Sequence, residues 1–270
     1  MLSLALSRRG ARHNSSMRDT IVKGKSEKPG HGKAETVLKR TLVNACRILA
    51  MAGQGDDVWG HVTGRVPGTN TFWMKPAGLG LEEIEVDDLL LVDLDGKVLR
   101  GRRPRHTEVF IHTEILRARP EVGAVVHTHP LPATVFSSLG IPLRPIMHEG
   151  TNFVPPDVPR FDETSDLIVS PELGRAVARV LGDRPALFLV SHGIVTAGAT
   201  IEEAAVNAIL LDKAARAQLM LPGGTPRFWT NDAEALVKRQ RIYNVDSLAS
   251  RWAYLLRVLA ASRRPRPSVR

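Results

Sequence analysis

The chain contains only one cysteine, Cys46, and no apolar run of membrane-spanning length. A single cysteine excludes an internal disulfide and favours a reducing compartment, where Cys46 would pack as a small hydrophobe. A membrane span would need about 20 consecutive apolar residues, and the stretch 2–6 is too short for a secretory signal. Residues 1–20 superficially match an organelle-targeting segment, with Met17 as an alternative start. On balance we predict a cytoplasmic protein without a membrane span.

Positive charge is concentrated at the two ends of the chain. The formal net charge is +9 over 270 residues, but residues 1–33 hold eight Lys/Arg against two acidic residues, and residues 263–270 hold four Arg. The remainder is close to neutral, which argues against a basic groove for nucleic acid. The 43% hydrophobic content can form a sizeable core. We therefore predict a basic, disordered extension over 1–33, one domain over 34–262 and a basic tail over 263–270.

The hydrophobic pattern predicts a mixture of helices and short strands. Apolar residues recur every three or four positions over 34–53, which indicates an amphipathic helix, and 201–219 predicts the longest helix. Further helices are expected over 107–118, 132–139 and 171–181, two more over 231–261, and strands over 61–66, 71–74, 89–93, 124–128, 186–191 and 194–196. Because strands and helices do not alternate strictly, and no internal repeat is evident, we predict an α/β sheet layered by helices.

Two histidines, His127 and His129, stand at the end of a predicted buried strand. Residues i and i+2 on a strand point to the same side, so these imidazoles would form half of a divalent metal site. Glu108 and His192 are candidates for the further ligands. On spacing alone, a surface or hydrogen-bonded histidine pair is an equally good interpretation.

Three segments together resemble the class II aldolase/adducin family: residues 60–65, 108–130 and 189–198. The resemblance runs from about Val37 to about Leu219. It implies a three-layer αβα domain with a mostly antiparallel central sheet, and a homotetramer with sites at subunit contacts.

The resemblance also implies roles for individual residues. His127, His129 and His192 would be ligands of a divalent metal, zinc above all, with Mn or Fe as alternatives, and Glu108 would be the acid/base. Without the resemblance, Glu108 would be interpreted as a glutamate that stabilises a helix N-terminus. His148 lies near the place where sugar-phosphate aldolases of the family bring in a tyrosine from an adjacent subunit, so we predict it as a proton donor.

Departures from the sugar-phosphate pattern concern the substrate. This chain has histidine and threonine at His106-Thr107 and His61-Val62-Thr63, and Lys75 replaces the threonine of a Thr-Pro-Ser/Thr-Gly motif. We predict His61, Thr63, Lys75, His106 and Thr107 as substrate-binding residues. They would suit a carboxylate-bearing or aromatic substrate better than a sugar phosphate, although Lys75 could be a surface residue. His112, one helical turn after Glu108, could orient that carboxylate or be a buried structural residue.

These residues support three hypotheses. The first is a metal-dependent carbon–carbon lyase that cleaves a small hydroxy-keto or hydroxyaromatic acid by retro-aldol reaction or decarboxylation, because a bound cation stabilises charge that develops on oxygen. The second, implied by the resemblance because a few proteins similar to this family act on aromatic 2-oxo acids with oxygen, is a non-haem iron oxygenase. The third is a non-catalytic, adducin-like interaction module that binds partners through its basic tails. Schiff-base chemistry would need a buried lysine, and Lys213 gives it little support.

Overall fold

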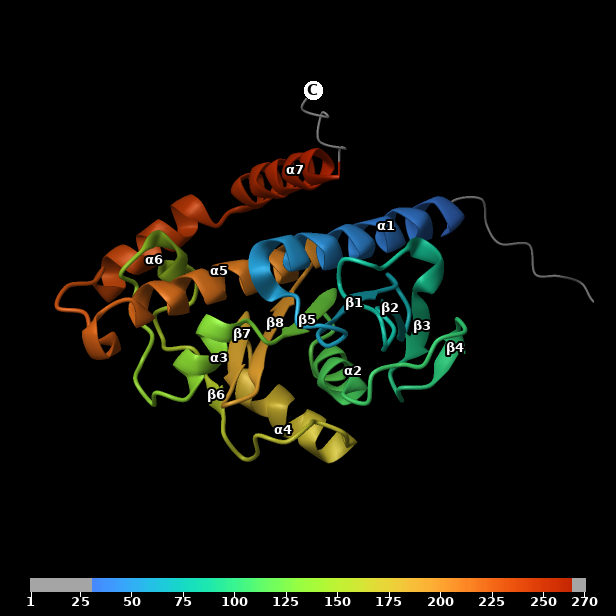
Figure 1. Cartoon of the computed structure of the whole chain (residues 1–270), viewed down its shortest axis with the longest axis horizontal. Helices are drawn as coiled ribbons and strands as arrows, with labels where there is room; N and C mark the ends of the chain where they lie inside the picture. Colours follow the sequence, from blue (N-terminus) through green and yellow to red (C-terminus); the bar gives the residue numbers. More distant parts are fainter. Residues whose placement is uncertain (1–30, 264–270) are drawn as a thin grey trace, which may run out of the picture.

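The computed structural model describes residues 31–263 (Figure 1). The predictions made for residues 1–30 and 264–270 lie outside the described residues. The α-helices are α1 (His31–Leu49), α2 (Val109–Ala118), α3 (Leu131–Ser137), α4 (Pro171–Leu181), α5 (Ile201–Leu219), α6 (Asp232–Ile242) and α7 (Val245–Ser262). A π-helix, η1 (Ala50–Gln54), extends α1, and short 3₁₀ helices form η2 (Val86–Asp88), η3 (His148–Asn152) and η4 (Pro222–Gly224).

One eight-stranded sheet crosses the domain. Its strands are β1 (His61–Arg65), β2 (Thr71–Met74), β3 (Leu90–Asp93), β4 (Val98–Arg100), β5 (Ala124–Thr128), β6 (Arg160–Phe161), β7 (Ala186–Leu189) and β8 (Gly193–Gly198). The spatial order is β4-β3-β2-β1-β5-β8-β7-β6. Every neighbouring pair is antiparallel except β6 and β7, which are parallel. The central position of β5 puts the predicted metal-binding strand between β1 and β8.

Alternating side chains of the central strands feed two separate cores. On β5, Val126 packs into the core that contains residues of α1, α3 and α5, whereas Val125 packs into the core that contains residues of α2 and α4. A strand buried on both faces is continuously apolar, as this one is. The helices therefore cover both faces of the sheet, as Figure 1 shows. The prediction of a three-layer αβα domain with a mostly antiparallel sheet is confirmed.

The helices begin and end largely where local chemistry predicts. The hydroxyl of Thr200 accepts a hydrogen bond from the backbone N–H of Glu203 and so caps α5. The predicted helix over 34–53 is correct in place, but its last turn is the π-helix, in which Gly53 has a φ of 81°. Cys46 is fully buried on α1, and burial raises the pKa of its thiol to about 12. Its predicted packing role is confirmed.

The sequence pattern missed the shortest strands. β4 has three residues and β6 has two, too few to show an alternating pattern. Both lie at the edges of the sheet. Their strand conformation depends on pairing with β3 and β7, and so on tertiary structure.

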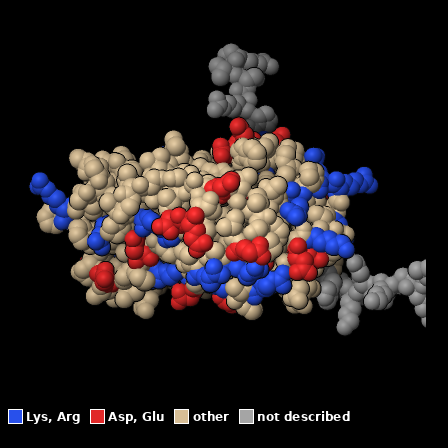
Figure 2. All heavy atoms as spheres, turned by 90° about the horizontal axis from the view of Figure 1, so that it is seen from below, with Lys and Arg blue, Asp and Glu red and all other residues tan. Residues whose placement is uncertain are grey.

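The surface agrees with the near-neutral charge of the body. On the face shown in Figure 2, acidic and basic side chains lie interspersed. Among residues 31–263, every helix is too short or too polar to cross a bilayer.

Candidate active site

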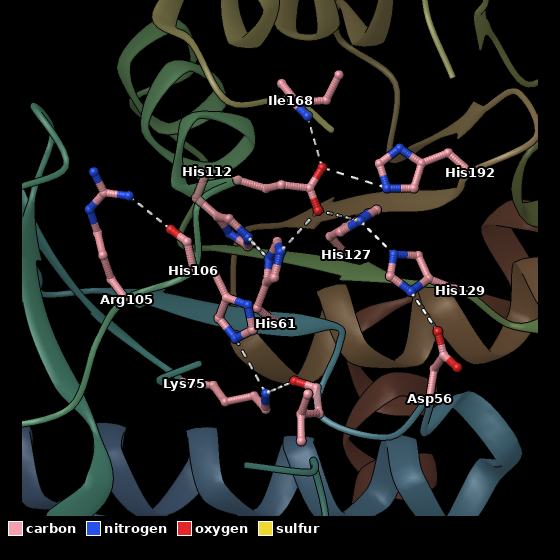
Figure 3. Close-up of polar contacts among 12 residues, drawn as sticks. Asp56, His61, Lys75, Arg105, His106, His112, His127, His129, Ile168 and His192 are labelled. Carbon is pink, nitrogen blue, oxygen red and sulfur yellow. Dashed lines mark hydrogen bonds and ion pairs between the residues drawn. The ribbon is translucent and has the colours of Figure 1, made fainter. Parts of the chain in front are cut away.

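Strand β5 and the turn between β7 and β8 bring three histidines together at one end of the central strands (Figure 3). His127 is the fourth residue of β5 and His129 follows it by two, so both point to the side covered by α2 and α4. His192 lies in the β7–β8 turn. Gly193 is needed beside it, because a Cβ at that position would lie 2.6 Å from the backbone oxygen of Thr128. The small residue lets the turn approach β5.

Glu108, at the N-terminus of α2, faces these histidines. Its Oε1 accepts a hydrogen bond from the backbone N–H of Ile168 (2.9 Å) and lies 3.5 Å from His192 Nε2. Its Oε2 lies 3.7 Å from His127 Nε2 and 3.8 Å from His61 Nε2. One ligand atom from each of four residues lies within 4.8 Å of the others: Glu108, His127, His129 and His192.

The donor set fits a divalent cation. His127 Nδ1 lies 2.9 Å from the backbone oxygen of Ile194, and His129 Nδ1 lies 3.0 Å from Asp56 Oδ2. Both acceptors are oxygens without a proton, so each Nδ1 is the N–H and each neutral ring has its lone pair on Nε2. These two Nε2 atoms lie only 2.9 Å apart. Two facing lone pairs repel unless a cation lies between them, and in a tetrahedral zinc site two such nitrogens would lie about 3.3 Å apart.

Burial keeps the imidazoles of His129 and His192 neutral. Burial, followed by the proximity of His127, lowers the pKa of His129 and of His192 to about 4. Burial alone would raise the pKa of Glu108, but its interactions with the nearby rings of His127 and His61 outweigh burial and hold the pKa below its ordinary value. At neutral pH the rings of His129 and His192 are therefore neutral, the form that binds a metal, and they lie beside a carboxylate that can accept a proton.

A pocket of about 330 Å³ opens over this cluster. It is lined by Asp56, Trp59, Gly60, His61, His106, Thr107, Glu108, His129, Ser165, Leu167, Ser191 and His192. Trp59 is 55% exposed and Leu167 is 46% exposed, so both offer apolar surface to the pocket. Neither lysine nor arginine is among these lining residues.

Of the predicted substrate-binding residues, His61, His106 and Thr107 line the pocket, whereas Thr63 lies behind it. Thr63 is fully buried, and its hydroxyl lies 2.8 Å from His112 Nδ1. His112 Nε2 in turn lies 2.6 Å from His61 Nδ1. The chain of contacts therefore runs from Thr63 through His112 to His61, and Thr63 reaches the pocket only through the two rings.

Lys75 also lies behind the pocket rather than on the surface, because it is fully buried. Its ammonium donates to the backbone oxygen of Val58 (2.9 Å) and lies 3.3 Å from His106 Nε2. Burial lowers the pKa of Lys75 to about 8, and burial together with the nearby ammonium lowers the pKa of His106 to about 3. The alternative of a surface lysine is wrong; Lys75 supports His106, and its direct contact with substrate stays a prediction.

Two further residues lie outside the pocket. His148 begins η3, where its backbone oxygen accepts a hydrogen bond from the hydroxyl of Tyr243 (2.8 Å), and it does not line the pocket of its own chain. Its role as a proton donor stays a prediction that requires a second subunit. Lys213 is exposed and pairs with Glu149 (3.2 Å), so the environment expected of a Schiff-base lysine is absent there.

The sequence reasoning missed Asp56, Trp59 and Leu167. Asp56 holds His129, and the other two form apolar parts of the pocket. All three lie in connections between elements, where no periodic pattern marks them. The only available signal was an acidic pair, Asp56-Asp57, shortly after the first helix of a chain expected to bind a metal.

Comparisons with known proteins show which family the chain resembles. The sequence model of the Class II Aldolase and Adducin N-terminal domain matches residues 40–219. The 3,4-dihydroxyphthalate decarboxylase of Arthrobacter keyseri is 33% identical over 195 residues, covering 68% of this chain and 78% of that protein. A 4-hydroxy-3-prenylphenylpyruvate oxygenase/4-hydroxy-3-prenylbenzoate synthase of Streptomyces roseochromogenus subsp. oscitans is 35% identical over 153 residues, covering 56% of this chain and 55% of that protein.

A solved structure extends the likeness to the whole domain. The L-fuculose 1-phosphate aldolase of Glaciozyma antarctica PI12 has a TM-score of 0.77 and 28% identity, covering 87% of this chain and 93% of that one. The fold and the His/Glu cluster define an enzyme of the metal-dependent, class II aldolase type. The chain belongs to the class II aldolase/adducin family. The alternative of a non-catalytic module is set aside, since the three relatives named above are enzymes and the four candidate ligand residues are all present.

Proposed function

We propose that the chain is a divalent-metal-dependent decarboxylase of a small hydroxyaromatic acid. The observation that carries this proposal is the pocket itself: a His/Glu cluster with apolar side chains around it and no lysine or arginine among its lining residues. A sugar phosphate would need cationic or amide groups for its phosphate. An aromatic ring gains from contact with Trp59 and Leu167. The relative named 3,4-dihydroxyphthalate decarboxylase supports the same substrate class.

We assign the metal to His127, His129 and His192, and zinc is the ion we expect, because three neutral imidazoles suit its preferences. When bound there, a divalent cation supplies Lewis-acid stabilisation of negative charge that develops on substrate oxygen. The protein supplies the orientation: the Ile194 carbonyl and the Asp56 carboxylate fix two of the three rings. Glu108 stays outside this set of three as the acid/base.

Loss of carbon dioxide requires a proton at the carbon that carried the carboxylate. Glu108 is placed to move this proton, because its carboxylate reaches the ligand cluster and is held in orientation by Ile168. We infer that Glu108 accepts a proton from a substrate hydroxyl or water and donates it to that carbon. His61 and His106, neutral because burial lowers the pKa of each, bind substrate oxygens.

The test is a product assay with metal-defined protein. Zinc-loaded protein is incubated with 3,4-dihydroxyphthalate, related hydroxybenzoic acids, hydroxy-keto acids and L-fuculose 1-phosphate, and carbon dioxide and aldehyde release are both measured. We expect carbon dioxide from a hydroxyaromatic acid, released about 10²- to 10⁴-fold more slowly by the Glu108→Gln variant. Aldehyde release from a hydroxy-keto acid or a sugar phosphate, without carbon dioxide, would replace decarboxylation by retro-aldol cleavage.

A second candidate is a non-haem iron oxygenase acting on an aromatic 2-oxo acid. The relative named 4-hydroxy-3-prenylphenylpyruvate oxygenase favours it, and histidines with a carboxylate also suit Fe(II). Iron-loaded protein that consumes oxygen with an aromatic 2-oxo acid would establish this activity. Full turnover under strict anaerobiosis would remove it.

We also infer a homo-oligomer, with a tetramer as the expected form. Large apolar side chains are exposed on α3 and near η4: Leu131 is 74% exposed, Met220 81% and Phe228 89%. Such side chains are typical of surfaces that another subunit covers. Light scattering would give the number of subunits, and a His148→Gln variant that keeps its oligomeric state but loses turnover would support a role in a neighbouring pocket. Location in the cytoplasm stays a prediction.

A further inference from the structure

The segment 54–58, which begins at the last residue of η1 and leads toward β1, makes three hydrogen bonds to residues of the active-site region. Gln54 Oε1 accepts a hydrogen bond from the hydroxyl of Thr128 (2.7 Å), which lies between His127 and His129 in the sequence. Asp56 Oδ2 accepts from His129 Nδ1 (3.0 Å). The backbone oxygen of Val58 accepts from the buried Lys75 (2.9 Å). These three hydrogen bonds hold the connection in a fixed position relative to the active site.

The first contact is buried and specific. Gln54 is 1% exposed and Thr128 is fully buried, so their hydrogen bond lies in a region of low dielectric, where losing it is costly. Gln54 reaches this position because the chain kinks at Gly53, which has a positive φ and a non-helical conformation. The irregular end of the helix thus places the side-chain oxygen of Gln54 within hydrogen-bond distance of Thr128.

The second contact gives one histidine a different partner from the others. His127 donates its Nδ1–H to a neutral backbone carbonyl, that of Ile194, and His192 Nδ1 is buried with no partner among residues 31–263. Of these three histidines, only His129 has a carboxylate at its Nδ1, the nitrogen turned away from the other ligand ring. A carboxylate that accepts from a ligand histidine fixes the ring and makes its other nitrogen a stronger metal ligand.

We propose that segment 54–58 is a brace for the metal-binding histidines, in which Asp56 positions His129 and strengthens its binding of a divalent cation. Gln54 holds Thr128, and with it the backbone between His127 and His129. This inference rests on the proposed metal site. Asp56 is a positioning residue that acts through His129. An ordinary surface ion pair would contribute little to any property of the protein.

The chain offers a closely matched control in Asp57. Both Asp56 and Asp57 are exposed aspartates at adjacent positions, but only Asp56 contacts a histidine. Asp57 has a φ of 45°, a conformation that asparagine tolerates. Asp56→Asn and Asp57→Asn therefore remove the same charge from nearly the same place, with little change in side-chain volume.

The measurement is the zinc dissociation constant, obtained by competition with a chromogenic chelator for the purified full-length chain. We expect Asp56→Asn to weaken zinc binding about 10- to 100-fold. Asp57→Asn should change it by less than about threefold. Thr128→Val, which removes the hydroxyl that contacts Gln54, should weaken zinc binding by a smaller factor. The visible spectrum of the cobalt-substituted protein provides a second readout and should change in Asp56→Asn but not in Asp57→Asn.

The outcomes separate this inference from the proposed function. If Asp56→Asn and Asp57→Asn bind zinc as the wild type does, the brace is overturned, even if the wild type decarboxylates a hydroxyaromatic acid. If Asp56→Asn alone weakens binding while no hydroxyaromatic acid reacts, the brace stands and the substrate proposal fails. Circular dichroism of each metal-free variant checks folding; a folded Asp56→Asn variant with unchanged zinc affinity contradicts the brace.

Discussion

Two groups of histidines lie side by side in this domain and differ in what their ring nitrogens contact. His127 and His129 use Nδ1 for protein acceptors and turn Nε2 toward each other. His112, which is fully buried, has both nitrogens engaged, one by Thr63 and one by His61. The rings of His61 and His127 are only 4.9 Å apart, so the groups share one neighbourhood. The difference teaches that partner atoms, more than residue type, decide whether a buried histidine can bind a ligand.

The largest effect should come from substituting one histidine of each group in a matched pair of variants. His127→Gln removes a proposed ligand and should abolish stoichiometric zinc, with turnover falling about 10⁴-fold or more, a loss of several kcal/mol of transition-state stabilisation. His112→Gln removes an enclosed ring and should keep one zinc per chain. Elemental analysis and carbon dioxide release measure both. Full zinc content in His127→Gln would contradict the assignment of His127 as a metal ligand and so the proposed difference between the two groups.

Glu108→Gln should separate metal binding from proton transfer. The amide keeps an oxygen that can accept from the N–H of Ile168, but it cannot take up a proton as the carboxylate does. We expect kcat to fall about 10²- to 10⁴-fold while zinc remains bound. Rapid-quench measurement of product together with zinc titration would show this. A variant that loses its zinc would make Glu108 a ligand, and the proposed division of roles would need revision.

Acid should destabilise the metal-free protein through its enclosed histidines. Burial lowers the pKa of His106 to about 3 and holds that of His112 well below its ordinary value, whereas both titrate near 6.5 in an unfolded chain. Below about pH 6.5 the unfolded chain binds protons that the folded chain does not. Stability is therefore fully present above that pH and decreases as the pH falls toward the folded-state pKa.

Urea denaturation at several pH values between 7.5 and 4.5 measures this dependence. The midpoint should move to lower urea as the pH decreases, and the dependence should be weaker in His106→Gln, which has one fewer buried imidazole. An unchanged slope in that variant would show that His106 is not the group responsible.

The smallest predicted effect concerns Thr63, which lies farthest from the pocket in the series of contacts Thr63–His112–His61. Thr63→Val keeps the shape but leaves His112 Nδ1 without its hydroxyl partner, which should cost about 1–3 kcal/mol of folding free energy. Thr63→Ser restores the hydroxyl and should recover most of that loss. Zinc content should be unchanged in both. If Thr63→Val were as stable as the wild type, the contact between Thr63 and His112 would contribute nothing to the folding free energy.

Much of the fold follows from local patterns. The ranges 71–74, 124–128, 171–181 and 201–219 were predicted with the boundaries that the structure has, because each is long enough or apolar enough to show its period. β4 and β6 escaped prediction because their conformation depends on a neighbouring strand. The candidate ligands were likewise visible in the sequence: His127 and His129 share a strand face by simple geometry.

What the sequence determined by itself is therefore the periodic structure, the separation of charge between ends and body, and the residue types able to bind a cation. Only the tertiary structure decided which partner each ring has: that Asp56 meets His129, and that Thr63 and Lys75 stand behind the pocket. Asp56 and His129 are 73 positions apart, and Thr63 and His112 are 49 apart. Local patterns record which face of an element is buried, whereas contacts over such separations depend on the register and packing of the whole sheet.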